Sequence, residues 1–177
     1  MRAVALLFLF ALRAFAEPPT EVPPRLAMLV MLKVLTYDSV FEARGQGDFV
    51  VAIPFSKGAE SAAEAVRVSL AELDIKTIKQ RSLVFRTVAW GSKTPADAVL
   101  VSSALTPDDL HAAVQASRAA KQYSLTFDER QVAEGVLLGV ASVNGKPQPV
   151  LNISTARALG AEFSPSVLKL VRAVQGP

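Results

Sequence analysis

The sequence has no cysteine and a single histidine among its 177 residues. The absence of cysteine excludes disulfide bonds, thiol nucleophiles and thiolate metal sites. The histidine, His111, falls on the exposed side of a predicted helix, which indicates a surface residue rather than a catalytic base. The carboxylate pairs Asp108/Asp109 and Asp128/Glu129 are sequence neighbours that point in different directions on a helix. They indicate helix starts, so we expect no catalytic group, no metal and no cofactor.

The first 16 residues have the three parts of a cleavable export signal. Arg2 supplies the positive charge, Val4 to Phe15 form an apolar run, and Ala14-Phe15-Ala16 is a small-residue cleavage site. A retained membrane anchor is the alternative, but Arg13 interrupts the run, which is shorter than the roughly 20 residues of a spanning helix. We therefore expect cleavage after Ala16 and an exported, extracytoplasmic protein.

A chain cleaved there carries almost no net charge. Loss of Arg2 and Arg13 takes the 19 Lys and Arg residues to 17, against 16 acidic residues, for a net charge of +1. Proteins that bind nucleic acid concentrate basic residues on one face, so we expect no nucleic-acid partner. The remaining length of about 160 residues suits one domain with a full apolar core.

An extended segment and an apolar helix are predicted after the signal. Residues 17–24 hold four prolines, which favour an extended lead-in to a single domain at 25–174. Residues 25–37 are apolar on nearly every side of a helix, which is typical of a core helix. Alternatively, one side of this helix binds a partner protein. The candidate contact residues are Met28, Met31 and Tyr37. The polar loop at 38–47 is expected to make the weakest contacts of the fold.

Strands and helices are predicted to alternate along the next hundred residues. Continuous apolar runs are typical of strands buried on both faces, and apolar residues at helical spacing separate them. The strands are expected at 48–55, 75–79, 83–89, 96–101 and 123–127, and the helices at 59–73 and from 106. This order favours an α/β fold, a three-layer α/β/α sandwich with a largely parallel sheet.

The last third of the chain predicts a hairpin and two helices. Strands at 135–143 and 148–153 flank Asn144-Gly145, a strong signal for a two-residue turn, so the parallel sheet is expected to be extended by a C-terminal antiparallel hairpin. A short helix is predicted to end at Gly160, and a last helix at 164–174.

Two loops are candidate small-ligand sites. Ser56, Lys57 and Gly58 follow one predicted strand, and Ser102 and Ser103 follow another. Loops at the carboxyl ends of strands line the crevice in which open α/β sheets bind ligands. Neither loop has a dinucleotide or Walker pattern, so phosphate binding is not indicated.

The C-terminal third carries the most distinctive pattern of the chain. It contains, in order, Gly135-Val136-Leu137-Leu138, Asn144-Gly145-Lys146, Asn152-Ile153, Ala156-Arg157-Ala158-Leu159-Gly160 and Val167-Leu168-Lys169-Leu170. This pattern resembles the YfiR family of periplasmic proteins. Lys33 and Tyr37 also fall where the first helix of that family tends to have a lysine and an aromatic residue.

The resemblance implies a periplasmic three-layer α/β domain that acts by binding rather than by catalysis. The name-giving member restrains an inner-membrane diguanylate cyclase through the sensory domain of that enzyme. The resemblance therefore implies a membrane-anchored sensory or signalling protein as partner, and a homodimer is a further expectation.

Two other function classes stay open at this point. A small-solute-binding protein associated with a transporter would place converging polar groups in the crevice. An enzyme would have a strongly shifted pKa in a cleft around Lys57, Asp97 or Asp128.

Overall fold

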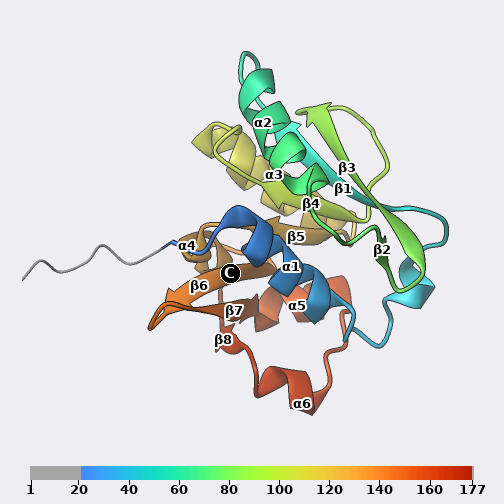
Figure 1. Ribbon diagram of the computed structural model, residues 1–177, viewed down its shortest axis with the longest axis vertical. Coiled ribbons are helices and arrows are strands. Elements are labelled where there is room, and N and C mark those ends of the chain that lie inside the picture. The colour runs from blue at the N-terminus through green and yellow to red at the C-terminus, as the bar shows by residue number, and fades with distance from the viewer. Residues whose placement is uncertain (1–20, 177) are drawn as a thin grey trace, which may run out of the picture.

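The computed structural model describes residues 21–176, whose strands form one eight-stranded sheet in the order β2-β3-β1-β4-β5-β6-β7-β8 (Figure 1). The strands are β1 (Phe49–Phe55), β2 (Thr77–Ile78), β3 (Arg81–Ala89), β4 (Ala98–Val101), β5 (Tyr123–Thr126), β6 (Leu138–Val143), β7 (Lys146–Asn152) and β8 (Arg172–Val174). The helices are α1 (Pro24–Leu35), α2 (Glu60–Ala71), α3 (Pro107–Ala119), α4 (Glu129–Ala133), α5 (Ile153–Leu159) and α6 (Pro165–Leu168), with a 3-10 turn, η1 (Glu42–Arg44).

The centre of the sheet is parallel. β3, β1, β4, β5 and β6 run in one direction, and β7 returns antiparallel to β6. The chain passes from β1 to β3 on one side and then to β4 on the other, so the strand order reverses between β1 and β4. Such a reversal opens a crevice at the carboxyl ends of the strands. The predicted α/β fold, with its parallel sheet and C-terminal hairpin, is confirmed.

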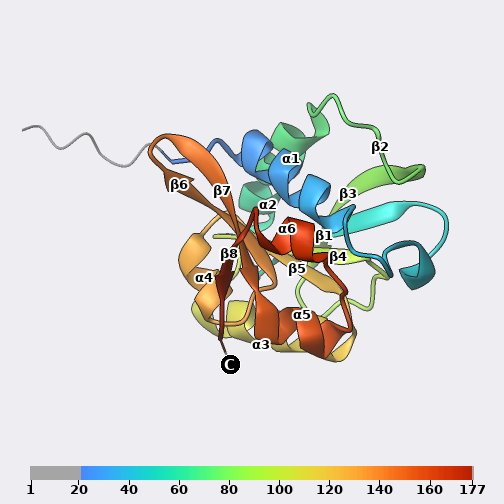
Figure 2. The same cartoon turned by 90° about the horizontal axis from the view of Figure 1, so that it is seen from below.

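Helices cover both faces of the sheet (Figure 2). α1 and α2 pack on one face, while α3, α4 and α5 pack on the other. The larger apolar cluster includes Met31 of α1, Val51 of β1 and Leu125 of β5, all of them fully buried. Buried and exposed residues do not alternate along β1, because helices cover both faces of the sheet there. For the same reason its sequence is continuously apolar.

The β6–β7 hairpin turns at the two predicted residues. Asn144 and Gly145 have φ values of 52° and 71°, the left-handed conformations of the turn type that matches the twist of a hairpin. Pro147 and Pro149 of β7 lie opposite Ser142 and Val140 of β6. They are tolerated there because a proline lacks only the N–H group that would point away from β6.

The predicted helix at 164–174 is wrong in its second half. Ser164 caps α6, which ends at Leu168, and residues 172–174 form β8 instead. β8 pairs parallel to β7 and places Arg172 opposite Val150. The pairing satisfies backbone groups along the outer edge of β7 that a longer helix would leave unpaired.

The expected signal peptide (1–16), its cleavage site and the first part of the lead-in lie outside the described residues. None of the helices within residues 21–176 is long and apolar enough to cross a membrane.

Candidate functional site

The partner surface predicted on α1 is only partly exposed. Met28 and Met31 are fully buried, so they are core residues and not the contact residues we expected. They point toward the sheet because α1 packs against β6 and β7. Tyr37, just after the helix, is 44% exposed and keeps its place as a candidate.

The outward side of α1 is itself apolar. Leu26 is 39% exposed, and Leu29 and Val30 are only partly buried. The ammonium group of Lys33 lies 5.1 Å from the centroid of the Tyr37 ring, which keeps this ring and this charge together at the end of the helix. α1 therefore presents an apolar outer side with a cation at one end.

α6 and the turn after it extend this apolar surface. Val167 and Val171 are buried in the same apolar cluster as the inner side of α1. Figure 1 shows α6 below the C-terminal end of α1. Leu168 and Leu170 are 39% and 66% exposed. We call the exposed residues Leu26, Tyr37, Leu168 and Leu170 the α1–α6 face. Large exposed apolar side chains on neighbouring parts of the fold are candidates for protein contacts.

A buried carboxylate anchors the loop that follows α1. Asp38 is 2% exposed and accepts hydrogen bonds from the Tyr123 hydroxyl at 2.7 Å, from Nε of Arg44 at 3.2 Å and from the Glu162 amide at 2.8 Å. Burial, and then the Asp38 carboxylate, raise the pKa of Tyr123, which stays a neutral donor. The expectation that the 38–47 loop makes the weakest contacts is therefore wrong.

A second ion pair holds the far end of the same loop. Arg81 binds Asp97 at 2.7 Å and also donates to the carbonyl groups of Gly47 and Asp48. The other oxygen of Asp97 accepts from the Val50 amide at 2.9 Å. Asp97, a candidate in the enzyme interpretation, thus has a structural position between β1, β3 and β4.

The two predicted ligand loops do not meet. Ser102 and Ser103 line an open hollow of about 1440 Å³ at the carboxyl ends of β4 and β5, whereas Ser56, Lys57 and Gly58 lie outside its lining. The Ser56 hydroxyl instead donates to Asp109 and accepts from the Thr106 amide at 2.9 Å, so it fastens the start of α3 to the end of β1. Lys57 and Gly58 are exposed in the turn.

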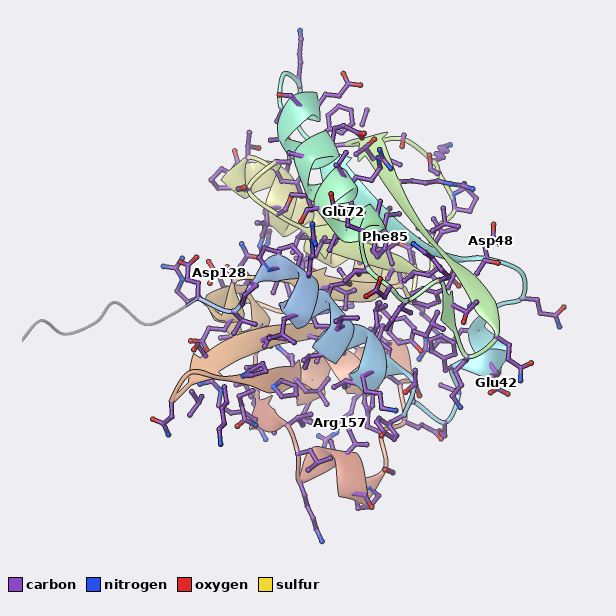
Figure 3. The ribbon with its side chains drawn as sticks, viewed as in Figure 1. Glu42, Asp48, Glu72, Phe85, Asp128 and Arg157 are labelled. Carbon is purple, nitrogen blue, oxygen red and sulfur yellow. The ribbon has the colours of Figure 1, made fainter. Side chains whose placement is uncertain are left out.

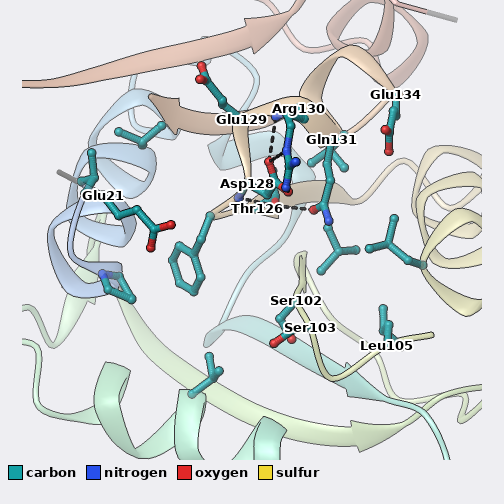
Figure 4. A pocket seen from close by; sticks show the side chains of 18 of the residues that line it. Glu21, Ser102, Ser103, Leu105, Thr126, Asp128, Glu129, Arg130, Gln131 and Glu134 are labelled. Atoms are coloured by element: carbon teal, nitrogen blue, oxygen red, sulfur yellow. Dashed lines mark hydrogen bonds and ion pairs between the residues drawn. The ribbon is translucent and has the colours of Figure 1, made fainter. Parts of the chain in front are cut away.

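The hollow is built from elements far apart in the sequence (Figure 4). Figure 4 shows Glu21 on one side, Ser102 and Ser103 below, and α4 with Arg130 above. Asp128 caps α4 and forms an ion pair with Arg130 at 2.7 Å, which lowers the pKa of Asp128. The sequence analysis missed α4 as a wall of the hollow, although Asp128/Glu129 had signalled a helix start.

The described residues that line the hollow form no recognisable catalytic apparatus. His111 borders it but is exposed, as the sequence predicted. A lowered pKa leaves Asp128 ionised at neutral pH, unsuited to act as a general acid. Among the described residues no three His, Cys, Asp or Glu side chains converge on a metal position.

Ion pairs also join neighbouring elements at the surface. Arg25 at the start of α1 binds Glu72 at the end of α2 (Figure 3), and Arg172 of β8 binds Glu129 of α4. These pairs tie the helices to each other and to the sheet edge around both candidate surfaces.

Comparison with solved structures finds the same fold in a larger protein. The crystal structure of the ABC domain in complex with L-Trp from Streptococcus pneumonia superposes with a TM-score of 0.55 at 14% sequence identity. The match covers 86% of this chain but only 60% of that chain. At this identity the likeness shows the fold alone.

Comparison at the level of sequence families is more specific. No curated protein matches this chain. The model of the YfiR/HmsC-like family matches residues 7–172, which is nearly the whole sequence. The chain belongs to the YfiR/HmsC-like family.

Proposed function

We propose that this chain is an exported, periplasmic regulatory protein that acts by contact with a membrane-anchored signalling protein of the diguanylate cyclase type. Membership of the YfiR/HmsC-like family carries the proposal. The role is one of binding and not of catalysis. In support, the residues within 21–176 that line the hollow include no set of groups arranged for a reaction.

The α1–α6 face is the proposed contact surface. Leu170 and Tyr37 are its most exposed members, at 66% and 44%. Tyrosine is among the residue types that contribute most to the binding free energy of protein interfaces, and the exposed leucine adds apolar area that loses water on binding. Buried Met28 and Met31 support this surface from below, because they fix α1 against the sheet.

A binding experiment with matched variants tests the surface. The exported protein, immobilised, is incubated with detergent-solubilised membranes of its source, and the retained proteins are identified by mass spectrometry. Leu170→Asp and Tyr37→Ala are expected to reduce retention of a membrane cyclase or sensor by about tenfold or more. Val143→Asp changes an apolar residue of similar exposure (41%) at the hairpin tip and serves as the control.

Folding must be measured in parallel. Melting temperatures of the surface variants are expected to stay near that of the parent, whereas Met28→Asp should unfold the domain because it buries an unpaired charge. If Leu170→Asp and Tyr37→Ala retained as much membrane protein as the Val143→Asp control, the α1–α6 face would not be the contact surface. Retention of no signalling protein by the parent would contradict the regulatory function itself.

Small-solute binding is the second candidate function. The hollow lies at the carboxyl ends of β4 and β5, and the larger structural relative was solved in complex with L-Trp. A rise in melting temperature on addition of L-tryptophan or another amino acid, together with retention of a transporter, would favour this function over the first.

A further inference from the structure

Along the hollow, one stretch of strand edge has no strand partner among residues 21–176. β5 and β6 pair only where Leu125 faces Leu138, whereas β6 continues in its ladder with β7 as far as Val143. The residues of β6 beyond that point, Val140 to Ser142, line the hollow. β6 therefore borders open space on its β5 side along this stretch.

The hairpin geometry directs backbone groups into this space. Asn144-Gly145 is a two-residue turn, so the backbone groups of Val143 and Lys146 form hydrogen bonds with each other. In an antiparallel ladder the backbone N–H and C=O groups of the adjacent residue of β6 then point away from β7. That residue is Ser142, whose partner Pro147 has no N–H group. The N–H and C=O groups of Ser142 are thus directed away from β7 and toward the hollow.

The walls of the hollow supply apolar contact and negative charge. Apolar side chains line it from several parts of the fold, and they include Val66 of α2, Leu110 of α3 and Phe127 after β5. Four carboxylates line the hollow, and the charged base among the lining residues is Arg130. The carboxylates are Glu21, Asp128, Glu129 and Glu134. Figure 4 shows Glu21 and Glu134 on opposite sides, so negative charge lies at both ends.

We propose that this hollow binds an extended peptide segment of a partner protein, added as a strand beside β6, with Lys or Arg side chains flanking an apolar residue. A free strand edge gives affinity through main-chain hydrogen bonds, and side-chain contacts select the sequence. The acidic lining favours a basic segment. The volume of about 1440 Å³ exceeds the roughly 300–1,000 Å³ of typical small-ligand pockets and suits a peptide.

This site is separate from the α1–α6 face, and its proposal does not depend on the function proposed above. The two are distinguished by variants: Leu170→Asp leaves the hollow unchanged, and substitutions in the hollow leave the α1–α6 face unchanged.

Defined peptides provide the test. Acetylated hexapeptides that alternate valine with lysine, and matched ones that alternate valine with glutamate, are titrated into the full exported protein and followed by amide NMR. We expect the lysine peptides to shift the resonances of Val140 to Ser142 and Phe127, and the glutamate peptides to bind at least tenfold more weakly. Glu134→Gln combined with Glu21→Gln should reduce this preference severalfold.

A substitution at Ser142 separates strand addition from simple charge attraction. Ser142→Pro removes the N–H group directed into the hollow and leaves the bonds to β7 in place, so peptide affinity should fall at least tenfold. Ser142→Ala keeps the N–H group and should bind the peptide like the parent.

Three results would each overturn the proposal. They are failure of every lysine peptide to bind, equal peptide affinity of Ser142→Pro and Ser142→Ala, and resonance shifts confined to residues outside the hollow. Displacement of bound peptide by a single amino acid at stoichiometric concentration would also overturn it, in favour of a small-solute site.

Discussion

The hydroxyl group of Tyr123 donates a 2.7 Å hydrogen bond to Oδ2 of Asp38, a residue 85 positions earlier in the chain. The other oxygen of the same carboxylate accepts from the amide of Glu162, which lies 124 positions away from Asp38. One buried side chain thereby joins the end of α1, the start of β5 and the segment before α6. The α1–α6 face is held in place by this junction.

Removal of the Tyr123 hydroxyl should destabilise the domain. Tyr123→Phe keeps the ring that stacks near Phe41 and removes one donor from a buried carboxylate, at an expected cost of about 1–3 kcal/mol in unfolding free energy. Urea denaturation measures the change. Tyr37→Phe, at an exposed position, should shift the free energy by no more than about 0.5 kcal/mol. Equal effects of the two substitutions would contradict the structural role of the Tyr123–Asp38 bond.

A methyl group at Gly139 should strain the packing of α4 on β6. A Cβ atom there would lie 2.7 Å from Cγ2 of Val132 and 3.2 Å from Cγ2 of Thr126. Gly139→Ala is expected to lower the unfolding free energy by about 1–3 kcal/mol. Val132→Ala removes the clashing methyl group, so the double variant should be more stable than the sum of the two single effects predicts. If the changes in unfolding free energy of the two single variants simply added up in the double variant, contact with Val132 would not be the cause of the destabilisation by Gly139→Ala.

Removal of the buried Asn152 side chain should lower the unfolding free energy more than removal of an ordinary helix cap does. Its oxygen accepts from the Thr155 amide at 2.9 Å, and its Nδ2 donates to the Val132 carbonyl at 2.7 Å. Asn152→Ala loses a cap worth about 1 kcal/mol. It also loses the hydrogen bond to the Val132 carbonyl, worth about 0.5–1.5 kcal/mol, although that carbonyl still accepts from the Gly135 amide at 3.2 Å. Ser164→Ala removes the cap of the exposed helix α6 and serves as the control. If Asn152→Ala lowered the unfolding free energy no more than Ser164→Ala does, a stabilising role of the hydrogen bond to the Val132 carbonyl would be contradicted.

The Asp128–Arg130 pair predicts a specific dependence of stability on pH. The hydrogen bond from Arg130 lowers the pKa of Asp128 in the folded state below its ordinary value near 3.8. A group with a lowered folded pKa stabilises the fold above its unfolded pKa, and this contribution disappears as the pH falls through the folded pKa. The melting temperature of Asp128→Asn should therefore lie below that of the parent at pH 7 and pH 5.

The difference should shrink between pH 4 and pH 2, where the parent carboxylate becomes protonated. The effect should be small because the pair is partly exposed to solvent. A difference in melting temperature that is constant from pH 7 to pH 2 would show that the substitution acts through the α4 cap geometry and not through charge.

Local sequence patterns predicted most of the secondary structure. The Asn144-Gly145 turn and the end of α5 at Gly160 were each predicted from a few adjacent residues. These features depend on backbone conformations and short-range hydrogen bonds that the side chains themselves determine. The order of strands and helices followed from hydrophobic periodicity for the same reason.

Contacts between distant segments could not be predicted in this way. The composition of α1 did not reveal which of its apolar residues face the sheet, and the predicted contact residues Met28 and Met31 proved to be core. Asp38 looked like one polar loop residue among several, and its partners Tyr123 and Glu162 could not be inferred from its neighbours in the sequence.

By itself the sequence determined the α/β class, the hairpin and the family resemblance, because each depends on residue types or on spacing within one segment. The tertiary structure alone decided that residues 172–174 form a strand and that Ser102, not Ser56, lines the hollow. It also decided that part of one edge of β6 has no strand partner among the described residues. Those outcomes depend on which backbone groups and apolar surfaces from distant segments meet, and burial and hydrogen-bond pairing settle them only once the whole sheet is assembled.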